Sequence, residues 1–315
     1  MPSVTVAVIT RNRKELLKKC LVSVLSGTLV PDEVRVYDNA STDGTAEMLR
    51  EEFPEVKVVG NKENFGLSFC HNLALSDFTT DSLLLLDDDN IVAPDMLEKL
   101  QRKLFSDPKL GIVLPLFMNG YDDPKTVCFC GGETSLWSGR NLLNDKNFSK
   151  ERETYPTFRV PNATLIKKEA AQATGLMDDR LFSTMADEDY CRRMEKQGYK
   201  ALYLLDAVTD HMQEVKRSDA RRLGLTNPLQ TYIFARNRAV LIKRYGSALQ
   251  FLVFFIFWQP LYHLYYLFNM ARYKAPASFF KAYLKGVWAS LIFVFTGSLP
   301  PLAEILKAFS QPENN

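Results

Sequence analysis

Short apolar runs rich in β-branched residues alternate with longer amphipathic stretches through the first ninety or so residues. The apolar runs have the length of buried strands, whereas the stretches between them have helical spacing. This pattern predicts strands at 4–9, 34–37, 56–59 and 82–86, and helices at 14–25, 45–53 and 69–76. Because such alternation is typical of parallel α/β sheets, we expect an α/β fold with a mostly parallel sheet.

Clusters of polar residues follow three of these strands directly. The clusters are Thr10–Arg13, Asp38–Gly44 and Asp87–Asn90. Ligands of parallel α/β sheets bind beyond the carboxyl ends of the strands. We therefore expect a binding site where the three clusters meet.

The middle of the chain is less regular. Apolar runs predict strands at 111–116 and 158–166, and the stretch between them is rich in glycine, asparagine and aspartate, as mobile loops are. A helix is expected at 168–174, and the acidic cluster Ala186–Asp189 opens another that continues to about Gln197. A strand at 201–205 precedes Asp210 and His211.

The composition changes after residue 228, where the chain becomes more apolar. A basic and apolar helix is expected at 231–245, and residues 248–270 are almost all apolar or aromatic. As a helix, this second segment would be roughly 34 Å long, enough to cross a bilayer core of ~30 Å. Gln259, Pro260 and His263 interrupt it, however. A later segment, 286–299, would be only about 21 Å long, which is short for a span.

Three arrangements suit this C-terminal region: a broken or re-entrant hairpin, interfacial helices, or a buried helical subdomain. Lysine and arginine flank the first apolar segment on both sides, which disfavours a single simple crossing. Aromatic residues of the kind found at membrane interfaces favour membrane association; they are Trp258, Tyr262, Tyr265, Tyr266 and Trp288. We expect an α/β domain at 1–226 and a helical, membrane-associating region at 227–315.

Composition and charge narrow the function classes. Of 315 residues, 46% are hydrophobic and 24% charged, as in ordinary folded enzymes. Lys and Arg number 39 against 37 Asp and Glu, so the balance predicts no nucleic-acid partner. Five scattered cysteines favour free thiols in a reducing compartment over a disulfide framework. The first ten residues form an expected strand and not a signal peptide, which predicts a cytoplasmic location.

Carboxylates supply most of the candidate chemistry. Asp87, Asp88 and Asp89 follow a buried strand and would repel one another unless a cation lay among them. Such oxygen ligands suit Mg²⁺ or Mn²⁺, although a solvated acidic turn is the alternative. Asp38 ends its strand where a carboxylate can accept hydrogen bonds from a base or ribose. Asp187 opens a helix, a position that the helix dipole alone would favour.

The order and spacing of these motifs resemble the inverting glycosyltransferases of family 2, which have the GT-A fold. The matching segments are VAVITRNR at 6–13, VYDNASTDGT at 36–45, NKENFGLS at 61–68 with Asn72 after it, LLLLDDDN at 83–90, DEDYCRRMEKQGY at 187–199, and His211. The resemblance extends over about residues 3–245. It implies a Rossmann-like GT-A catalytic domain followed by the C-terminal helical region.

The resemblance also implies roles for individual residues. It assigns the nucleotide-sugar site to Thr10, Arg11, Asn12, Asp38, Asn64, Gly66 and Asp88. It assigns the metal site to Asp87, Asp89 and His211, and the catalytic base to Asp187, with Arg192 or Arg193 at the usual basic position. Two residues depart from the family pattern, since Ala186 stands where Glu is common and His71 where Arg is common.

Together these assignments predict a metal-dependent inverting glycosyltransferase at the cytoplasmic face of the cell membrane. A sugar would move from a nucleotide-diphosphate donor to a hydroxyl of a lipid-linked or polysaccharide acceptor, with Asp187 as general base. A polyprenyl phosphate is an alternative acceptor, and it would need no base. A non-catalytic nucleotide-sugar-binding protein is an alternative of another class.

Overall fold

The computed structural model describes residues 1–129, 131–143, 149, 151–160, 163–182, 185–212 and 227–309. Contacts within the chain divide it into two compact units. The sheet unit consists of Met1–Glu133, Leu143–Met177 and Asp187–Glu214. The helical unit consists of Thr134–Leu142, Asp178–Ala186 and Val215–Asn315.

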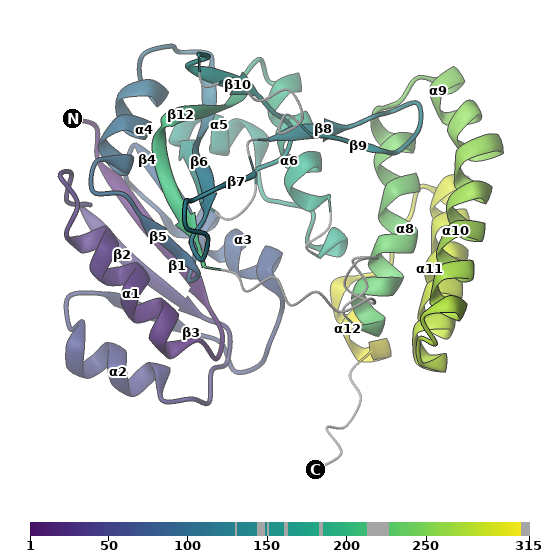
Figure 1. The fold of residues 1–315 in the computed structure, drawn as a ribbon, viewed down its shortest axis with the longest axis horizontal. Helices are drawn as coiled ribbons and strands as arrows, with labels where there is room; N and C mark the ends of the chain where they lie inside the picture. The colour runs from purple at the N-terminus through teal and green to yellow at the C-terminus, as the bar shows by residue number, and fades with distance from the viewer. Residues whose placement is uncertain are drawn as a thin grey trace. The chain divides into compact units, whose positions relative to one another are not determined.

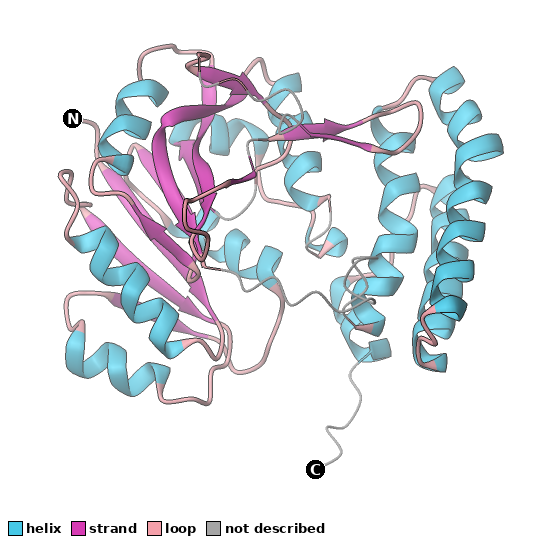
Figure 2. Cartoon of the chain, viewed as in Figure 1, coloured by secondary structure: helices cyan, strands magenta, loops and turns pink. Residues whose placement is uncertain are grey.

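The first half of the sheet is parallel (Figures 1 and 2). Strands β1 (Val4–Thr10), β2 (Glu33–Asp38), β3 (Lys57–Gly60) and β4 (Ser82–Asp87) lie in the order β3-β2-β1-β4. Helices α1 (Lys14–Leu25), α2 (Thr45–Glu52) and α3 (Leu67–Asp77) connect them. Every residue of β1 is buried, because a central parallel strand is covered on both faces. The predicted succession of strands and helices is confirmed here.

The second half of the sheet is mixed. Strand β11 (Ala163–Lys167) runs antiparallel between β4 and β6 (Leu110–Asn119), and β12 (Lys200–His211) runs parallel to β6. Three short strands pair antiparallel with these; they are β5 (Asn90–Val92), β7 (Val127–Phe129) and β10 (Thr154–Pro156). Among the described residues, β1 to β4, β6 and β12 run in one direction within the ten-stranded sheet, which confirms its mostly parallel character.

Helices α4 (Met96–Leu104), α5 (Lys168–Thr174) and α6 (Ala186–Lys196) separate the later strands along the chain. The strand expected at 158–166 begins only at Ala163, and residues 161 and 162 lie outside the described part. Just before them the backbone turns, since Thr157 Oγ1 accepts a hydrogen bond from the N–H of Arg159 at 2.9 Å. The strand expected at 201–205 extends to His211, because it pairs with both β6 and β5.

The glycine-rich stretch expected to be a loop contains short strands. Besides β7 and β10 it includes β8 (Gly132–Thr134) and β9 (Asn141–Leu143), which pair only with each other among the described strands. Strands of three residues leave almost no periodic signal in a sequence, so the hydrophobic pattern did not predict them.

The helical unit is built on α8 (Pro228–Tyr245), which begins after the N-cap Asn227 and is buried along most of its length. Helix α9 (Ala248–Val253) continues through a π-helical turn, η3 (Phe254–Trp258), into α10 (Gln259–Arg272). The turn lies next to Pro260, which lacks an N–H and disturbs α-helical hydrogen bonding. A short 3-10 helix, η2 (Asp179–Leu181), and helices α11 (Ala277–Thr296) and α12 (Leu302–Phe309) complete the described part of the unit.

Two helical segments of this unit have the length and apolarity of a membrane span. They are Ala248–Arg272, with 25 residues, and Ala277–Thr296, with 20 residues. The expectation that the second apolar segment is too short is corrected, because its helix begins at Ala277 and not at residue 286. Large apolar side chains are exposed on these helices, including Leu261, Leu264, Phe268, Trp288 and Phe295. Both features are compatible with a membrane-associating region.

Candidate functional site

Loops at the carboxyl ends of three neighbouring strands form the expected site edge. In the sheet register, Thr10 of β1 lies opposite Asp38 of β2, and Ile9 lies opposite Asp87 of β4. The N–H of Asn39 donates to the Thr10 carbonyl at 3.0 Å, and the N–H of Asp88 donates to the Ile9 carbonyl at 3.2 Å. The structure therefore brings the three polar clusters to one edge of the sheet.

Arg13 holds two carboxylates of the aspartate triplet. Its Nη1 atom lies 3.0 Å from Asp88 Oδ1 and 2.9 Å from Asp89 Oδ2, so one guanidinium group bridges both residues. Asp88 Oδ2 also accepts a hydrogen bond from Thr10 Oγ1 at 2.6 Å. Burial raises the pKa of Asp88, and the Thr10 hydrogen bond and the Arg13 charge offset this only in part. The motifs did not assign a role to Arg13, although it closes the 6–13 segment.

His211 is the second cation at the triplet. It ends β12, where it lies opposite Asn90 of β5, and its Nε2 atom is 3.5 Å from Asp89 Oδ2. Burial would lower the pKa of His211, but Asp89 and the thiol of Cys128 raise it to about 10. Burial would likewise raise the pKa of Asp89, but His211 and Arg13 hold it below the ordinary value. Asp89 and His211 thus form an ion pair in the absence of ligand.

Asp87 has no such partner. Its Oδ1 atom is buried and has no hydrogen-bond partner within the described residues. Burial, together with the charges of Asp89 and Asp88, raises the pKa of Asp87 well above its ordinary value. The imidazole of His71 lies 4.0 Å away, but burial lowers its pKa to about 4, so it is neutral at physiological pH. A buried carboxylate in this position requires a cation or a proton.

The chemistry of this donor set fits a divalent cation. Carboxylate oxygens suit Mg²⁺ or Mn²⁺, and the unpartnered Oδ1 of Asp87 offers a ligand that nothing else described uses. Across the described ranges, however, no three His, Cys, Asp or Glu side chains already surround one metal position. Arg13 and His211 occupy Asp89, so metal binding requires their contacts to rearrange.

Asn39 organises the loops beside Asp38, and the motifs did not single it out. Its Oδ1 atom accepts hydrogen bonds from the N–H of Phe65 and from Asn61 Nδ2, each at 3.1 Å. Its Nδ2 atom donates to Asn64 Oδ1 at 2.7 Å, and the N–H of Gly66 donates to the same oxygen at 3.0 Å. Gly66 has φ of 87°, a conformation that favours glycine. The network positions Asn64 and Gly66 at the N-terminus of α3.

The remaining predicted nucleotide residues lie in the loops after β1 and β2. Asp38 is buried, and its Oδ1 atom accepts the N–H of Ser41, three residues later, at 2.9 Å. Asn12 has φ of 51°, and its Oδ1 atom accepts the N–H of Thr42 at 2.7 Å. Asn12 therefore ties the two loops together, while Arg11 is exposed beside it.

Asp187 lies at the start of α6 and is half-buried. Its Oδ2 atom accepts the N–H of Val160 at 3.2 Å, and no hydrogen bond joins it to the aspartate triplet among the residues described. Burial raises the pKa of Asp187 despite the nearby charge of Arg159, so the group retains a proton more readily than an exposed aspartate. That shift gives it stronger basicity when ionised.

The two arginines of α6 pair with the two acidic residues that follow Asp187. Arg192 pairs with Glu188 at 2.8 Å, and its guanidinium lies 4.4 Å from the centre of the Phe158 ring. Arg193 pairs with Asp189 at 3.0 Å. Both pairs are i, i+4 contacts that stabilise the helix bearing Asp187.

Comparisons of sequence identify related proteins. A family model described as "Glycosyl transferase family 2" matches residues 5–172, more than half of the 315-residue chain. Galactofuranosyltransferase GlfT1 of Mycolicibacterium smegmatis is 25% identical over 259 residues, which cover 77% of this chain and 84% of that protein. Chondroitin synthase of Pasteurella multocida is 27% identical over 138 residues, which cover 40% of this chain and 14% of that protein.

Solved structures share the architecture of the chain. The mannosyltransferase PcManGT of Pyrobaculum calidifontis, in complex with GDP-Man and Mn²⁺, aligns with 98% of this chain and 79% of its own, at a TM-score of 0.54 and 21% identity. GalNAc-T7 with UDP, GalNAc and Mn²⁺ aligns with 69% of this chain and 44% of its own, at a TM-score of 0.58 and 18% identity. At these identities the likeness establishes the GT-A fold, as the sequence motifs predict.

Proposed function

Because the chain belongs to glycosyltransferase family 2, we propose that it is a metal-dependent inverting enzyme that moves a sugar from a nucleotide diphosphate to a hydroxyl of a lipid-linked glycan. Membership of the family makes the chain a glycosyltransferase. One observation supports the proposed metal dependence in particular. At the carboxyl end of β4 lies the aspartate triplet, in which Asp88 and Asp89 are buried and the buried Oδ1 atom of Asp87 has no hydrogen-bond partner among the described residues.

The donor would bind across the loops after β1, β2 and β3. GDP-Man and UDP are bound in the two structures compared above, which supports a nucleotide-linked donor here. We assign contacts with the nucleotide sugar to Thr10, Arg11, Asn12, Asp38, Asn64, Gly66 and Asp88. The hydrogen bonds of Asn12 and Asn39 hold these loops in one conformation. The loops therefore lose little conformational entropy when the donor binds.

Asp87, Asp89 and His211 would hold the divalent ion, with the carboxylates as main ligands. Both compared structures contain Mn²⁺, which supports Mn²⁺ or Mg²⁺ for this chain. When bound, such an ion supplies positive charge to the departing nucleotide diphosphate. The protein's own contribution is to hold Asp88 through Thr10, while the Arg13 contact with Asp89 would give way to the ion.

Asp187 would act as the general base. The acceptor oxygen attacks the anomeric carbon as the bond from that carbon to the diphosphate oxygen breaks, and the hydroxyl proton moves to the Asp187 carboxylate. One displacement from the opposite face inverts the anomeric centre, and it needs only one base. The raised pKa of Asp187 suits this role, because burial makes the carboxylate a better proton acceptor.

We propose that the enzyme works at the cytoplasmic face of the cell membrane. The two apolar helical segments support attachment to a lipid surface. The described cysteines Cys20, Cys70, Cys128 and Cys191 are free thiols, which suits a reducing compartment. A lipid-linked acceptor would be available at that surface.

A polyprenyl phosphate is the second candidate acceptor. Its oxygen is already ionised, so transfer to it would not depend on Asp187. The half-buried Asp187 with a raised pKa favours the hydroxyl acceptor. A non-catalytic sugar-nucleotide sensor would bind donor without consuming it.

A panel of nucleotide sugars tests these proposals. The full chain is incubated with each donor, with and without Mn²⁺, and with a membrane extract as acceptor. We expect one donor to be consumed with metal, and sugar to reach lipid in the parent but not in Asp187→Asn or Asp89→Ala. Asp206→Asn, which changes an exposed aspartate, is the matched control. Normal transfer by Asp187→Asn would indicate a phosphate acceptor, and the absence of any donor turnover would rule out the enzymatic proposal.

A further inference from the structure

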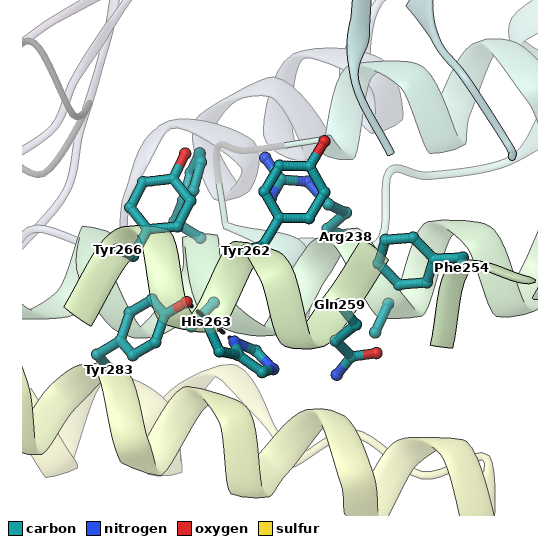
Figure 3. A pocket seen from close by; sticks show the side chains of 10 residues that line it. Arg238, Phe254, Gln259, Tyr262, His263, Tyr266 and Tyr283 are labelled. Atoms are coloured by element: carbon teal, nitrogen blue, oxygen red, sulfur yellow. Dashed lines mark hydrogen bonds between the residues drawn. The ribbon is translucent and has the colours of Figure 1, made fainter. Parts of the chain in front are cut away.

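The helical unit contains a small pocket lined by residues of α8, η3, α10 and α11 (Figure 3). Its walls are mainly aromatic and include Phe234, Tyr262, Tyr266 and Tyr283. The lining includes Arg238 from α8, and Figure 3 shows this side chain beside the ring of Tyr262. No aspartate or glutamate is among the described lining residues. The pocket therefore combines aromatic walls with an arginine that has no carboxylate counter-charge there.

Arg238 is held in place by contacts along its whole length. Its guanidinium carbon lies 4.0 Å from the centre of the Tyr262 ring and 4.9 Å from that of Phe234. Gly139 has φ of +70°, and a Cβ atom there would lie 2.6 Å from Arg238 Cδ and 2.9 Å from a Phe254 ring atom. The glycine thus allows the turn before β9 to pack against the arginine stem. A guanidinium fixed in this way loses little freedom when it binds an anion.

Four polar atoms of the pocket are buried without hydrogen-bond partners in the described part of the chain. They are Arg238 Nε, Gln259 Oε1, Tyr262 Oη and His263 Nε2. The other ends of two of these side chains are engaged, since Gln259 Nε2 donates to Ser290 Oγ at 3.4 Å and His263 Nδ1 lies 2.9 Å from the Tyr283 hydroxyl. Buried polar atoms are nearly always paired in folded proteins, so these four atoms are available to a polar molecule in the pocket.

Helix α10 is apolar outside and polar inside. Gln259, Tyr262, His263 and Tyr266 recur at i, i+3, i+4 and i+7 and face the pocket. On other faces of the helix, Leu261 is 56% exposed, Leu264 67% and Phe268 65%. A helix in water shows the opposite pattern, whereas polar residues of membrane helices face the interior and mark ligand sites. The ligand would then approach from a lipid phase.

We propose that this pocket binds the phosphate or diphosphate headgroup of a lipid. Arg238 Nε is buried at the pocket without a hydrogen-bond partner among the described residues, and a guanidinium N–H is a donor that phosphate oxygens accept. The Tyr262 hydroxyl and the His263 ring offer further polar contacts at the same place. The inference rests on the proposed function, because a lipid of this class would carry the acceptor to the membrane-bound enzyme.

Binding can be measured without any donor substrate. The full chain is purified in dodecyl maltoside and titrated calorimetrically with dodecyl phosphate. Inorganic phosphate and diphosphate supply the headgroup alone, and dodecyltrimethylammonium supplies the same tail with the opposite charge. We expect saturable binding of dodecyl phosphate at one site and none of dodecyltrimethylammonium. Arg238→Met should weaken binding about tenfold or more, since a charge-assisted contact is lost, and Arg238→Lys should recover part of the affinity.

Arg272→Met is the matched control, because it removes an exposed arginine of α10 in the same unit that does not line the pocket. It should bind dodecyl phosphate like the parent. Tyr262→Phe, which removes only the unpartnered hydroxyl, should weaken binding severalfold with an unchanged melting temperature. Equal affinity of the parent and Arg238→Met for dodecyl phosphate would overturn the proposal. Equal affinity for inorganic phosphate and dodecyl phosphate would show that the pocket binds free phosphate and not a lipid. Donor hydrolysis by the parent, measured separately, shows whether the glycosyltransferase proposal stands independently.

Discussion

Arg13 and a divalent cation would both use the carboxylate of Asp89. The guanidinium bridges Asp88 and Asp89 at about the distances of charge-assisted hydrogen bonds, and it is the part of the loop after β1 that contacts the triplet most directly. The sequence motif contains this arginine, but only the folded geometry shows that it stands where positive charge is needed.

Removing this competitor should strengthen metal binding in the absence of nucleotide. We expect Arg13→Met to bind Mn²⁺ about two- to fivefold more tightly than the parent, because a half-exposed ion pair contributes up to about 1 kcal/mol. Electron paramagnetic resonance of free Mn²⁺ measures this directly. Arg102→Met, at an exposed arginine on α4, should leave the affinity unchanged. Weaker Mn²⁺ binding by Arg13→Met would show that Arg13 supports the metal site and does not compete with the ion.

Asp178 gives the helical unit a pH-dependent contribution to stability. Burial would raise its pKa, but hydrogen bonds from Arg180 and Arg244 lower it to about 2, below the ordinary 3.8. Because the pKa of Asp178 is lower in the folded protein than in the unfolded chain, its ionised carboxylate stabilises the fold above about pH 4. This contribution disappears as the pH falls from about 4 to 2. Asp178→Asn should therefore reduce the free energy of unfolding by roughly 1–2 kcal/mol at pH 7, measured by denaturant titration in detergent.

The neighbouring residue provides the control for this prediction. Burial and the charge of Asp178 raise the pKa of Asp179, so Asp179→Asn should not destabilise the protein at pH 7. The difference in free energy of unfolding between the parent and Asp178→Asn should become smaller as the pH falls below 4. A difference that stayed constant down to pH 2 would mean that the carboxylate charge is not the source of the stabilisation.

At the scale of elements, α8 and α11 approach each other through a glycine. A Cβ atom at Gly286 would overlap the backbone oxygen of Tyr232 and lie 2.9 Å from the Ala235 side chain. Small residues allow helices to pack at such short distances in membrane-type bundles. We expect Gly286→Ala to destabilise the helical unit by about 1–3 kcal/mol, seen as a lower thermal midpoint in detergent. Gly60→Ala should not, because nothing lies within 4 Å of that position.

Elements with a strong local apolar pattern could be predicted from the sequence. Strands β1 and β4 contain apolar runs and β2 alternates valine with polar residues, and each is followed by a polar cluster, so their succession and the site edge follow from local pattern. Strand β11 is also apolar, but its antiparallel place between β4 and β6 depends on distant pairing. Short strands such as β9 have too few residues for a period, and the side-chain bridges of Arg13 and Asn39 depend on loops that meet only in the folded chain.

For the molecule as a whole, attachment to a membrane should depend on apolar contact more than on charge. The net charge is only +2, so electrostatic attraction alone would be screened at high salt. We expect the parent to sediment with vesicles even at high salt, and Leu264→Glu combined with Phe268→Glu to bind more than tenfold more weakly, since each buried side chain contributes roughly 1.5–3 kcal/mol. Val22→Glu with Val58→Glu, which changes exposed apolar residues of the sheet unit, should bind like the parent. If the Leu264 and Phe268 variant still sedimented fully, α10 would not contact lipid through this face, and its exposed side chains would have to serve another protein surface.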